Sequence, residues 1–253
     1  MAEPLPAPTV TLPARSWRID PRHALVAAAL CWAGFAAMVV AVEAGRTGWL
    51  DSAGLLLWRG GADLRPVGPA WLLEALRDVT ALGGVLIRNV VMAAALFALL
   101  VLRLRREALV LLGTVIGGWL VNSGIKALVG RPRPTIVPHL TEAGGASFPS
   151  GHSFNAAVVY LAIALAFAAM SPRQPVRLTV IAAAALLSMA IAFSRVWLGV
   201  HFPSDVIAGW LGGVGWALLA AALLDRPAKA VAAQAGEAIE AATPGEVATA
   251  PRK

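Results

Sequence analysis

Six long apolar runs constrain the fold of this chain more than any other feature of its sequence. Their bounds are Leu25–Ala44, Val85–Leu102, Ala108–Val129, Phe154–Met170, Leu178–Val196 and Val206–Leu224. About 20 helical residues cross the hydrocarbon of a bilayer, and a backbone in lipid must satisfy its own hydrogen bonds. The sequence therefore predicts an all-α membrane protein, built as a bundle of six transmembrane helices.

The composition also indicates that a bilayer, rather than water, is the solvent of this chain. Of its 253 residues, 58% are hydrophobic and 14% are charged, which is too apolar for a water-soluble domain of this size. The formal charge is +7, but the basic residues cluster at the ends of apolar runs, as topology signals do, and no nucleic-acid partner is expected. Cys31 is the only cysteine, so the chain cannot form an internal disulfide or a cysteine metal site.

The chain divides into one membrane domain and two tails. Residues 24–225 contain the six runs and are predicted to form a single domain, whereas residues 1–23 and 226–253 are predicted to be disordered tails. The first run follows basic residues as a secretory signal would, but no clear cleavage site follows it, so we expect a retained helix. Roughly 40 residues between the first two runs mix tryptophan and leucine with charges, which predicts short interfacial helices.

Basic residues beside the runs predict the orientation. The side that holds both termini carries Arg15, Arg18, Arg22, Arg103, Arg105, Arg106, Arg173, Arg177, Arg226 and Lys229. The opposite side carries Arg46, Arg59, Arg65, Arg77 and Arg131, largely matched by nearby acids. This bias predicts cytoplasmic termini and an outer, periplasmic or extracellular, opposite face in a bacterial inner (plasma) membrane. An aromatic belt is expected at that face, formed by Trp49, Trp58, Trp71 and Trp197.

Three polar clusters interrupt the apolar sequence, and a six-span topology places all of them on the outer side. They are Lys126 to Pro134, Phe148 to Ser153, and Ser194-Arg195 with His201 to Asp205. Lys126, Arg133 and Arg195 bring three positive charges to a membrane interface, where unpaired charge is costly. An anion is the expected partner, and two guanidiniums with an ammonium suit a phosphate.

The second and third clusters add the other parts of a phosphate reaction. Pro149-Ser150-Gly151 before a helix offers backbone N–H groups, a hydroxyl and the positive end of the helix dipole. Asp205 follows His201 by one helical turn, so it could hold one ring nitrogen while the other attacks phosphorus. His152 could give a proton to the leaving oxygen and then activate water. The cations could neutralise the phosphate oxygens, so neither a metal nor a cofactor is expected.

Each cluster by itself also has a simpler interpretation. Lys126 and Arg133 alone could be interfacial anchors, the Pro-Ser-Gly-His run a helix start, and His201 with Asp205 a structural pair. Their joint occurrence favours a phosphate site. Arg88, near the outer start of the second run, is expected to snorkel to the interface rather than to reach the substrate.

Together the clusters resemble the pattern Lys-x6-Arg-Pro, Pro-Ser-Gly-His, Ser-Arg-x5-His-x3-Asp of the type 2 phosphatidic acid phosphatase (PAP2) superfamily, in its membrane lipid phosphatase branch. The resemblance covers residues 120–215, and the remaining runs fit a six-helix plan. It implies phosphate binding by Lys126, Arg133, Ser150, Gly151 and Arg195. It further implies that His201 is the nucleophile, that His152 acts as acid and base, and that Asp205 supports His201.

The resemblance implies a metal-independent phosphatase that forms a phosphohistidine at the outer face and acts on a lipid phosphate or diphosphate. The expected substrates, in order, are undecaprenyl diphosphate, then phosphatidic acid or phosphatidylglycerophosphate, then lipid A phosphate. Two alternatives remain open: a lipid phosphotransferase with the same first half-reaction, and a non-catalytic lipid-binding or lipid-translocating protein. No protein partner is expected, and the sequence leaves the oligomeric state open.

Overall fold

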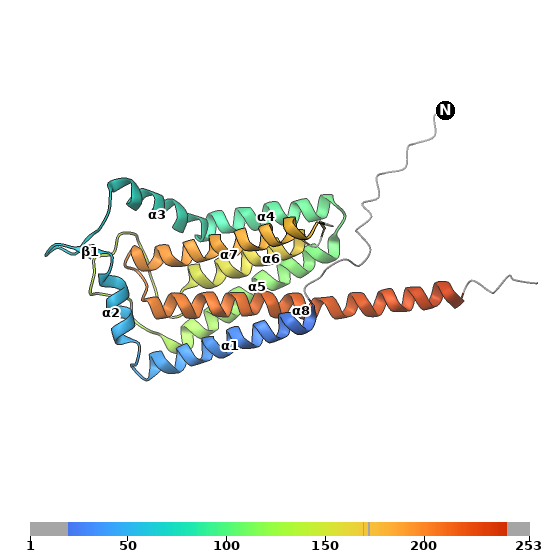
Figure 1. Ribbon diagram of the computed structural model, residues 1–253, viewed down its shortest axis with the longest axis horizontal. Coiled ribbons are helices and arrows are strands. Elements are labelled where there is room, and N and C mark those ends of the chain that lie inside the picture. Colours follow the sequence, from blue (N-terminus) through green and yellow to red (C-terminus); the bar gives the residue numbers. More distant parts are fainter. Residues whose placement is uncertain (1–19, 169, 172, 242–253) are drawn as a thin grey trace, which may run out of the picture.

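The computed structural model of the protein describes residues 20–168, 170–171 and 173–241, with side chains described up to residue 222 in the last helix. Six long helices run side by side in one bundle (Figure 1). They are α1 (Pro21–Glu43), α4 (Val85–Val101), α5 (Arg105–Val129), α6 (Gly151–Ala168), α7 (Gln174–Trp197) and α8 (Pro203–Ala241). Each helix contains one of the predicted apolar runs, which confirms the expected all-α membrane fold.

Five of these helices are long and apolar enough to cross a membrane by themselves, with residues 203–222 as the spanning part of α8. A sixth span is obtained when α3 (Ala70–Leu82) and α4 are counted together, as a pair that meets at an angle of 50°. Gly83 and Gly84 form the break between α3 and α4. We call this break the elbow.

The segment between α1 and the elbow lies at one end of the bundle (Figure 1). It contains α2 (Gly48–Leu56), an antiparallel hairpin of β1 (Arg59–Gly60) and β2 (Arg65–Pro66), and α3. The short helices were predicted from the sequence, but the hairpin was not, because strands of two residues carry no alternating pattern. This segment covers the bundle end at which α5 and α7 finish and α6 and α8 begin.

Helix α6 is the centre of the bundle and packs against α5, α7 and α8. Small residues allow this packing, as expected for helices in lipid. A Cβ atom on Gly209 would lie 2.7 Å from the Ser150 carbonyl oxygen, and one on Gly213 would overlap the Phe154 carbonyl oxygen. The backbone of α8 therefore lies directly against the first turns of α6, which places the polar starts of both helices together.

Two expectations from the sequence differ from the structure. Helix α8 continues to Ala241, past residue 225, where the membrane domain was predicted to end; the abundant alanine of this part favours helix. Residues 242–253 of the predicted C-terminal tail and residues 1–19 of the predicted N-terminal tail lie outside the described residues. Trp49 and Trp71 are 76% and 67% exposed, as a belt requires, but Trp197 is only 2% exposed. Trp197 is buried because the cap of α2, α3 and the hairpin covers the end of α7.

Candidate active site

His201 and Asp205 form a buried pair where α8 begins. His201 precedes the helix and Asp205 lies in its first turn, with exposures of 2% and 0%. The Nδ1 atom of His201 is 3.4 Å from Asp205 Oδ2, and Ser147 Oγ lies 3.4 Å from the same Nδ1 while donating a hydrogen bond to Oδ2. The Phe202 N–H donates to Oδ2 at 3.0 Å. These contacts fix the ring with its Nε2 atom directed away from the carboxylate.

Arg133 defines the other side of the His201 ring. Its Nη1 atom lies 3.1 Å from His201 Nε2 and 2.7 Å from the Val200 carbonyl oxygen. Its remaining donors bind the carbonyl oxygens of Gly145 and Gly144, at 3.1 and 2.7 Å. A guanidinium can only donate hydrogen bonds, so Nε2 must be the acceptor and Nδ1 carries the ring proton toward Asp205. Nε2 is therefore unprotonated, and its lone pair accepts a hydrogen bond from a positively charged group.

The charge state of His201 agrees with this tautomer. Burial lowers its pKa from 6.5 to about 4, although the hydrogen bond and the charge of Asp205 act in the opposite direction. The charges of Arg133 and Arg195 lower the pKa further. His201 is therefore neutral at physiological pH, which is the state a nucleophilic imidazole needs.

Lys126 holds the segment that supports the pair. It lies in the last turn of α5, and its Nζ atom donates to the carbonyl oxygens of Ala146 at 2.6 Å and Ser147 at 3.4 Å. Ser147 is itself the residue that donates to Asp205. Lys126 thus connects α5 to the loop before α6.

Arg195 is a buried cation with spare donors. It is 3% exposed, and its Nη1 atom donates to Thr80 Oγ1 of α3 at 2.8 Å. Its Nε atom is buried and finds no hydrogen-bond partner among the described residues. Because leaving a buried donor unsatisfied costs about 1–3 kcal/mol, this geometry indicates that an acceptor belongs there.

At the start of α6, the three predicted site residues differ in burial: Ser150 is buried, whereas Gly151 and His152 are partly exposed. The Ser150 N–H donates to the Asp205 carbonyl oxygen at 3.0 Å, and the fully buried Ser150 side chain faces the Ser153 N–H at 3.5 Å. Its hydroxyl thus lies inside the helix start. The His152 ring makes no hydrogen bond to another described residue, and the charges of Arg195, Arg133, Arg88 and His201 act on it.

Four helix ends thus bring the predicted residues into one cluster. The comparisons with known proteins address the same segment, because the sequence pattern of the PAP2 superfamily matches residues 107–228. Phosphatidylglycerophosphatase B of Bacillus subtilis (strain 168) is 34% identical over 148 residues, which cover 57% of this chain and 71% of that protein. The chain belongs to the PAP2 superfamily.

Other relatives of this PAP2 protein support the same placement. Lipid A 1-phosphatase of Rhizobium johnstonii is 36% identical over 45% of this chain, which spans 46% of that relative. The crystal structure of the transmembrane PAP2 type phosphatidylglycerolphosphate phosphatase from Bacillus subtilis superposes with a TM-score of 0.68 and 26% identity, covering 79% of this chain and 96% of that one. The protein is therefore an integral membrane phosphatase of the lipid phosphatase branch.

The sequence did not identify two residues that connect this PAP2 site to its cap, Asp51 and Arg131. Arg131 Nη1 donates to Asp205 Oδ1 at 2.6 Å and to Ser204 Oγ at 2.8 Å, and Nη2 donates to Asp51 Oδ2 at 2.7 Å. Asp51 also accepts from the N–H and hydroxyl of Ser204, at 3.0 and 2.9 Å. Arg131, expected to be a topology signal, is an internal bridge between α2 and α8. Asp51 precedes the buried Leu55 by four residues, which places both on the same face of a helix. This spacing was the sequence signal that could have identified Asp51 as buried.

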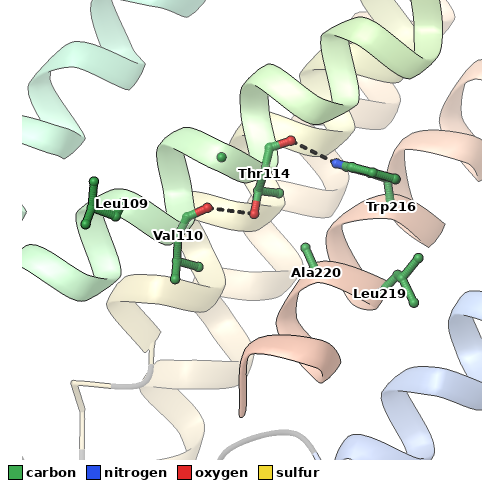
Figure 2. A pocket seen from close by; sticks show the side chains of 7 residues that line it. Leu109, Val110, Thr114, Trp216, Leu219 and Ala220 are labelled. Atoms are coloured by element: carbon green, nitrogen blue, oxygen red, sulfur yellow. Dashed lines mark hydrogen bonds between the residues drawn. The ribbon is translucent and has the colours of Figure 1, made fainter. Parts of the chain in front are cut away.

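An apolar hollow of about 400 Å³ lies at the opposite end of the bundle from this cluster, between α5 and α8 (Figure 2). Its lining includes Leu109, Val110 and Leu219. Thr114 Oγ1 donates to the Val110 carbonyl oxygen at 2.8 Å, and Trp216 Nε1 donates to the Thr114 carbonyl oxygen at 2.8 Å. These polar groups are satisfied, so the hollow offers nothing to a phosphate.

Proposed function

We propose that this PAP2 enzyme removes the terminal phosphate of a lipid phosphate or diphosphate through a phosphohistidine on His201. One observation carries the proposal: His201 Nε2 is an unprotonated nitrogen held 3.1 Å from Arg133 Nη1, with Asp205 behind the ring. A nucleophile next to a guanidinium is the arrangement needed to attack an oxyanion, because the cation neutralises the phosphate as it approaches.

In the first step, His201 Nε2 attacks the terminal phosphorus and the bond from phosphorus to the leaving oxygen breaks. The leaving oxygen takes the bonding electrons and receives a proton from His152. The ring proton of His201 remains bonded to Nδ1, where it is directed toward Asp205. Arg133, Arg195 and Lys126 would hold the equatorial oxygens, with the spare Nε donor of Arg195 among their contacts. The N–H groups at Gly151 and His152 would add the helix dipole.

In the second step, a water molecule attacks the phosphorus of the phosphohistidine. His152, now neutral, accepts a proton from this water, and the nitrogen–phosphorus bond breaks. Phosphate leaves and His201 returns to its neutral state, so protons balance over the cycle. We also propose that the reaction needs no metal ion, so a chelator should leave the rate of phosphate release unchanged. A chelator that abolishes activity, followed by recovery when a divalent ion is added, would contradict this.

The site is proposed to face the periplasm, with both termini in the cytoplasm. Arg59 and Arg131 had counted against this orientation, but both have buried partners, the Trp197 carbonyl oxygen at the end of α7 and the Asp51 carboxylate of α2, so they are not free topology charges. A lipid could then enter sideways from the outer leaflet. The candidate substrates are undecaprenyl diphosphate, phosphatidic acid, phosphatidylglycerophosphate and lipid A phosphate.

Phosphate release by the purified protein in detergent tests this function. The four candidate lipids form the substrate panel, and His201→Ala is the inactive control. We expect release with at least one lipid and, with His201→Ala, a rate at least about 10³-fold lower. Full activity of His201→Ala would exclude the nucleophile assignment. Radiolabelled phosphate recovered on an added lipid or sugar alcohol, rather than in solution, would indicate a phosphotransferase instead.

A further inference from the structure

Arg88 is a buried cation that the three motifs do not include. It lies in the first turn of α4 and is 8% exposed, so the expectation that it snorkels to the interface is wrong. Its side chain donates one hydrogen bond, from Nη1 to the Gly83 carbonyl oxygen at 3.2 Å. Among the described residues no carboxylate lies within salt-bridge distance of it. A buried guanidinium without an anion is costly, which indicates that a ligand supplies one.

The elbow places Arg88 next to His152. Gly83, whose carbonyl oxygen binds Arg88, packs on the other side against the His152 ring: a Cβ atom there would lie 3.2 Å from His152 Cδ2. The elbow is itself held in place, since Tyr160 of α6 donates to the Leu82 carbonyl oxygen at 2.7 Å. Arg88 is therefore on the side of the site where His152 meets the leaving oxygen, not on the side of His201.

The charges around the cluster leave room for more than one phosphate. Asp51 and Asp205 share Arg131, so that group has a net charge of −1. Lys126, Arg88, Arg133 and Arg195 add four positive charges, which leaves the region at +3. A terminal phosphate brings about −1.5 to −2 at neutral pH. At least one positive charge is then available for a second anionic group of the substrate.

We propose that Arg88 binds the anionic leaving group of the substrate, and that the preferred substrate class is a lipid diphosphate. This inference rests on the proposed function. When His201 attacks the terminal phosphorus of a diphosphate, the bridging oxygen departs as part of a lipid monophosphate, which takes the electron pair and the proton of His152. The leaving phosphate is negatively charged and lies beside Arg88. From a lipid monophosphate, the protonated leaving group is a neutral alcohol, and Arg88 has no anion to bind.

The ratio of kcat/KM for a lipid diphosphate to kcat/KM for the monophosphate of the same lipid tests this proposal. Both substrates meet the same folded population, so partial misfolding of a variant cancels from the ratio. We expect Arg88→Gln to lower kcat/KM for the diphosphate by about 10- to 100-fold, as loss of a charged hydrogen bond predicts. For the monophosphate we expect a change below about threefold. Arg88→Lys, which keeps the charge, should restore most of the ratio.

The matched control is Arg65→Gln, which removes an arginine from the exposed hairpin, where its partner is Asp63 and its side chain is 82% exposed. It should leave both rates unchanged. Equal losses on the two substrates in Arg88→Gln, or complete inactivity on both, would overturn the role of Arg88 and leave the proposed function standing. A wild-type protein that releases phosphate from neither lipid would overturn the proposed function itself.

Discussion

His201 owes its neutral state to the groups on both sides of its ring. Asp205 accepts a hydrogen bond from the Nδ1–H group, and Arg133, which can only donate, faces Nε2. Burial adds to this arrangement by disfavouring a charged imidazole. The neutral state that the proposed mechanism requires of His201 is therefore present in the folded structure before any substrate binds.

This arrangement predicts the acidic limit of activity. With a pKa of about 4, His201 keeps its lone pair until the pH falls to that value, so kcat/KM should decline below about pH 4 rather than near 6.5. The same lowered pKa means that its stabilising contribution is present above 6.5 and is lost as the pH falls through 4. Phosphate release measured from pH 3 to 8, with recovery at pH 7 as the control for unfolding, checks this. A reversible decline of kcat/KM as the pH falls through about 6.5 would contradict the claim that burial lowers the pKa of His201.

Arg131 is predicted to matter more for stability than Asp51. Arg131→Gln would leave two carboxylates, with side-chain exposures of 3% and 0%, without their shared cation, and should cost about 3–5 kcal/mol. Asp51→Asn keeps the Arg131–Asp205 bond and an oxygen that can accept from Ser204, so about 1 kcal/mol is expected. Unfolding in detergent measures both. The double variant should be less destabilised than the sum of the single variants, and strict additivity would mean that the network is not coupled.

At the scale of elements, α2 and the elbow are the supports of the site. Helix α2 exposes Trp49 on one face and directs Asp51 and Gly54 toward α8, where a Cβ on Gly54 would overlap Pro203. Just before the elbow, Thr80 of α3 accepts a hydrogen bond from Arg195, and in the elbow Gly83 packs on His152. Neither element carries a motif residue, yet each fixes the position of one.

The elbow predicts a strong effect of a side chain at Gly83. A Cβ there would overlap Ile191 Cγ2 and approach the His152 ring to 3.2 Å, so Gly83→Val should displace His152 and lower kcat by at least about tenfold. The matched control is Gly113→Ala in α5, where a Cβ would meet nothing within 4 Å, and which should leave kcat unchanged. Normal kcat in correctly folded Gly83→Val would mean that the elbow does not position His152.

At the scale of the whole molecule, the cap covers the polar cluster at one end of the bundle (Figure 1), and an apolar hollow opens between α5 and α8 at the other end (Figure 2). The cap covers the cluster around His201 and Asp205, while the start of α1 and the end of the spanning part of α8 lie at the other end of the bundle. This arrangement keeps the charged cluster at one membrane face, where water and phosphate have access.

The proposed orientation can be measured by cysteine labelling. Cys31 is the only native cysteine, so in a Cys31→Ser background a membrane-impermeant maleimide reports single introduced sites. Trp49→Cys, at an exposed position of the cap, should react in intact spheroplasts, whereas Arg105→Cys, at the exposed start of α5, should react only after permeabilisation. The opposite labelling pattern would place the site in the cytoplasm and rule out hydrolysis at the outer face.

Much of the fold could be predicted because lipid makes helix formation a local requirement. Each apolar run has to satisfy its own backbone, so its length and composition were enough to locate the helix. The ends of runs were less certain, as α8 shows, because alanine-rich sequence continues a helix without an apolar signal. The hairpin could not be located because its two-residue strands carry no alternating pattern. The elbow could not be located because it depends on contacts with distant segments, such as those of Gly83 with Ile191 and His152.

The sequence by itself determined six apolar helices and the residue types of three polar clusters, because hydropathy and spacing are properties of neighbouring residues. Only the tertiary structure decided which atoms meet: that Arg133 faces His201 Nε2, that Arg131 joins Asp51 to Asp205, and that Arg88 is buried behind His152. Those contacts join residues that are far apart in the sequence. Their geometry depends on how closely the small residues of α6 and α8 allow the helices to pack.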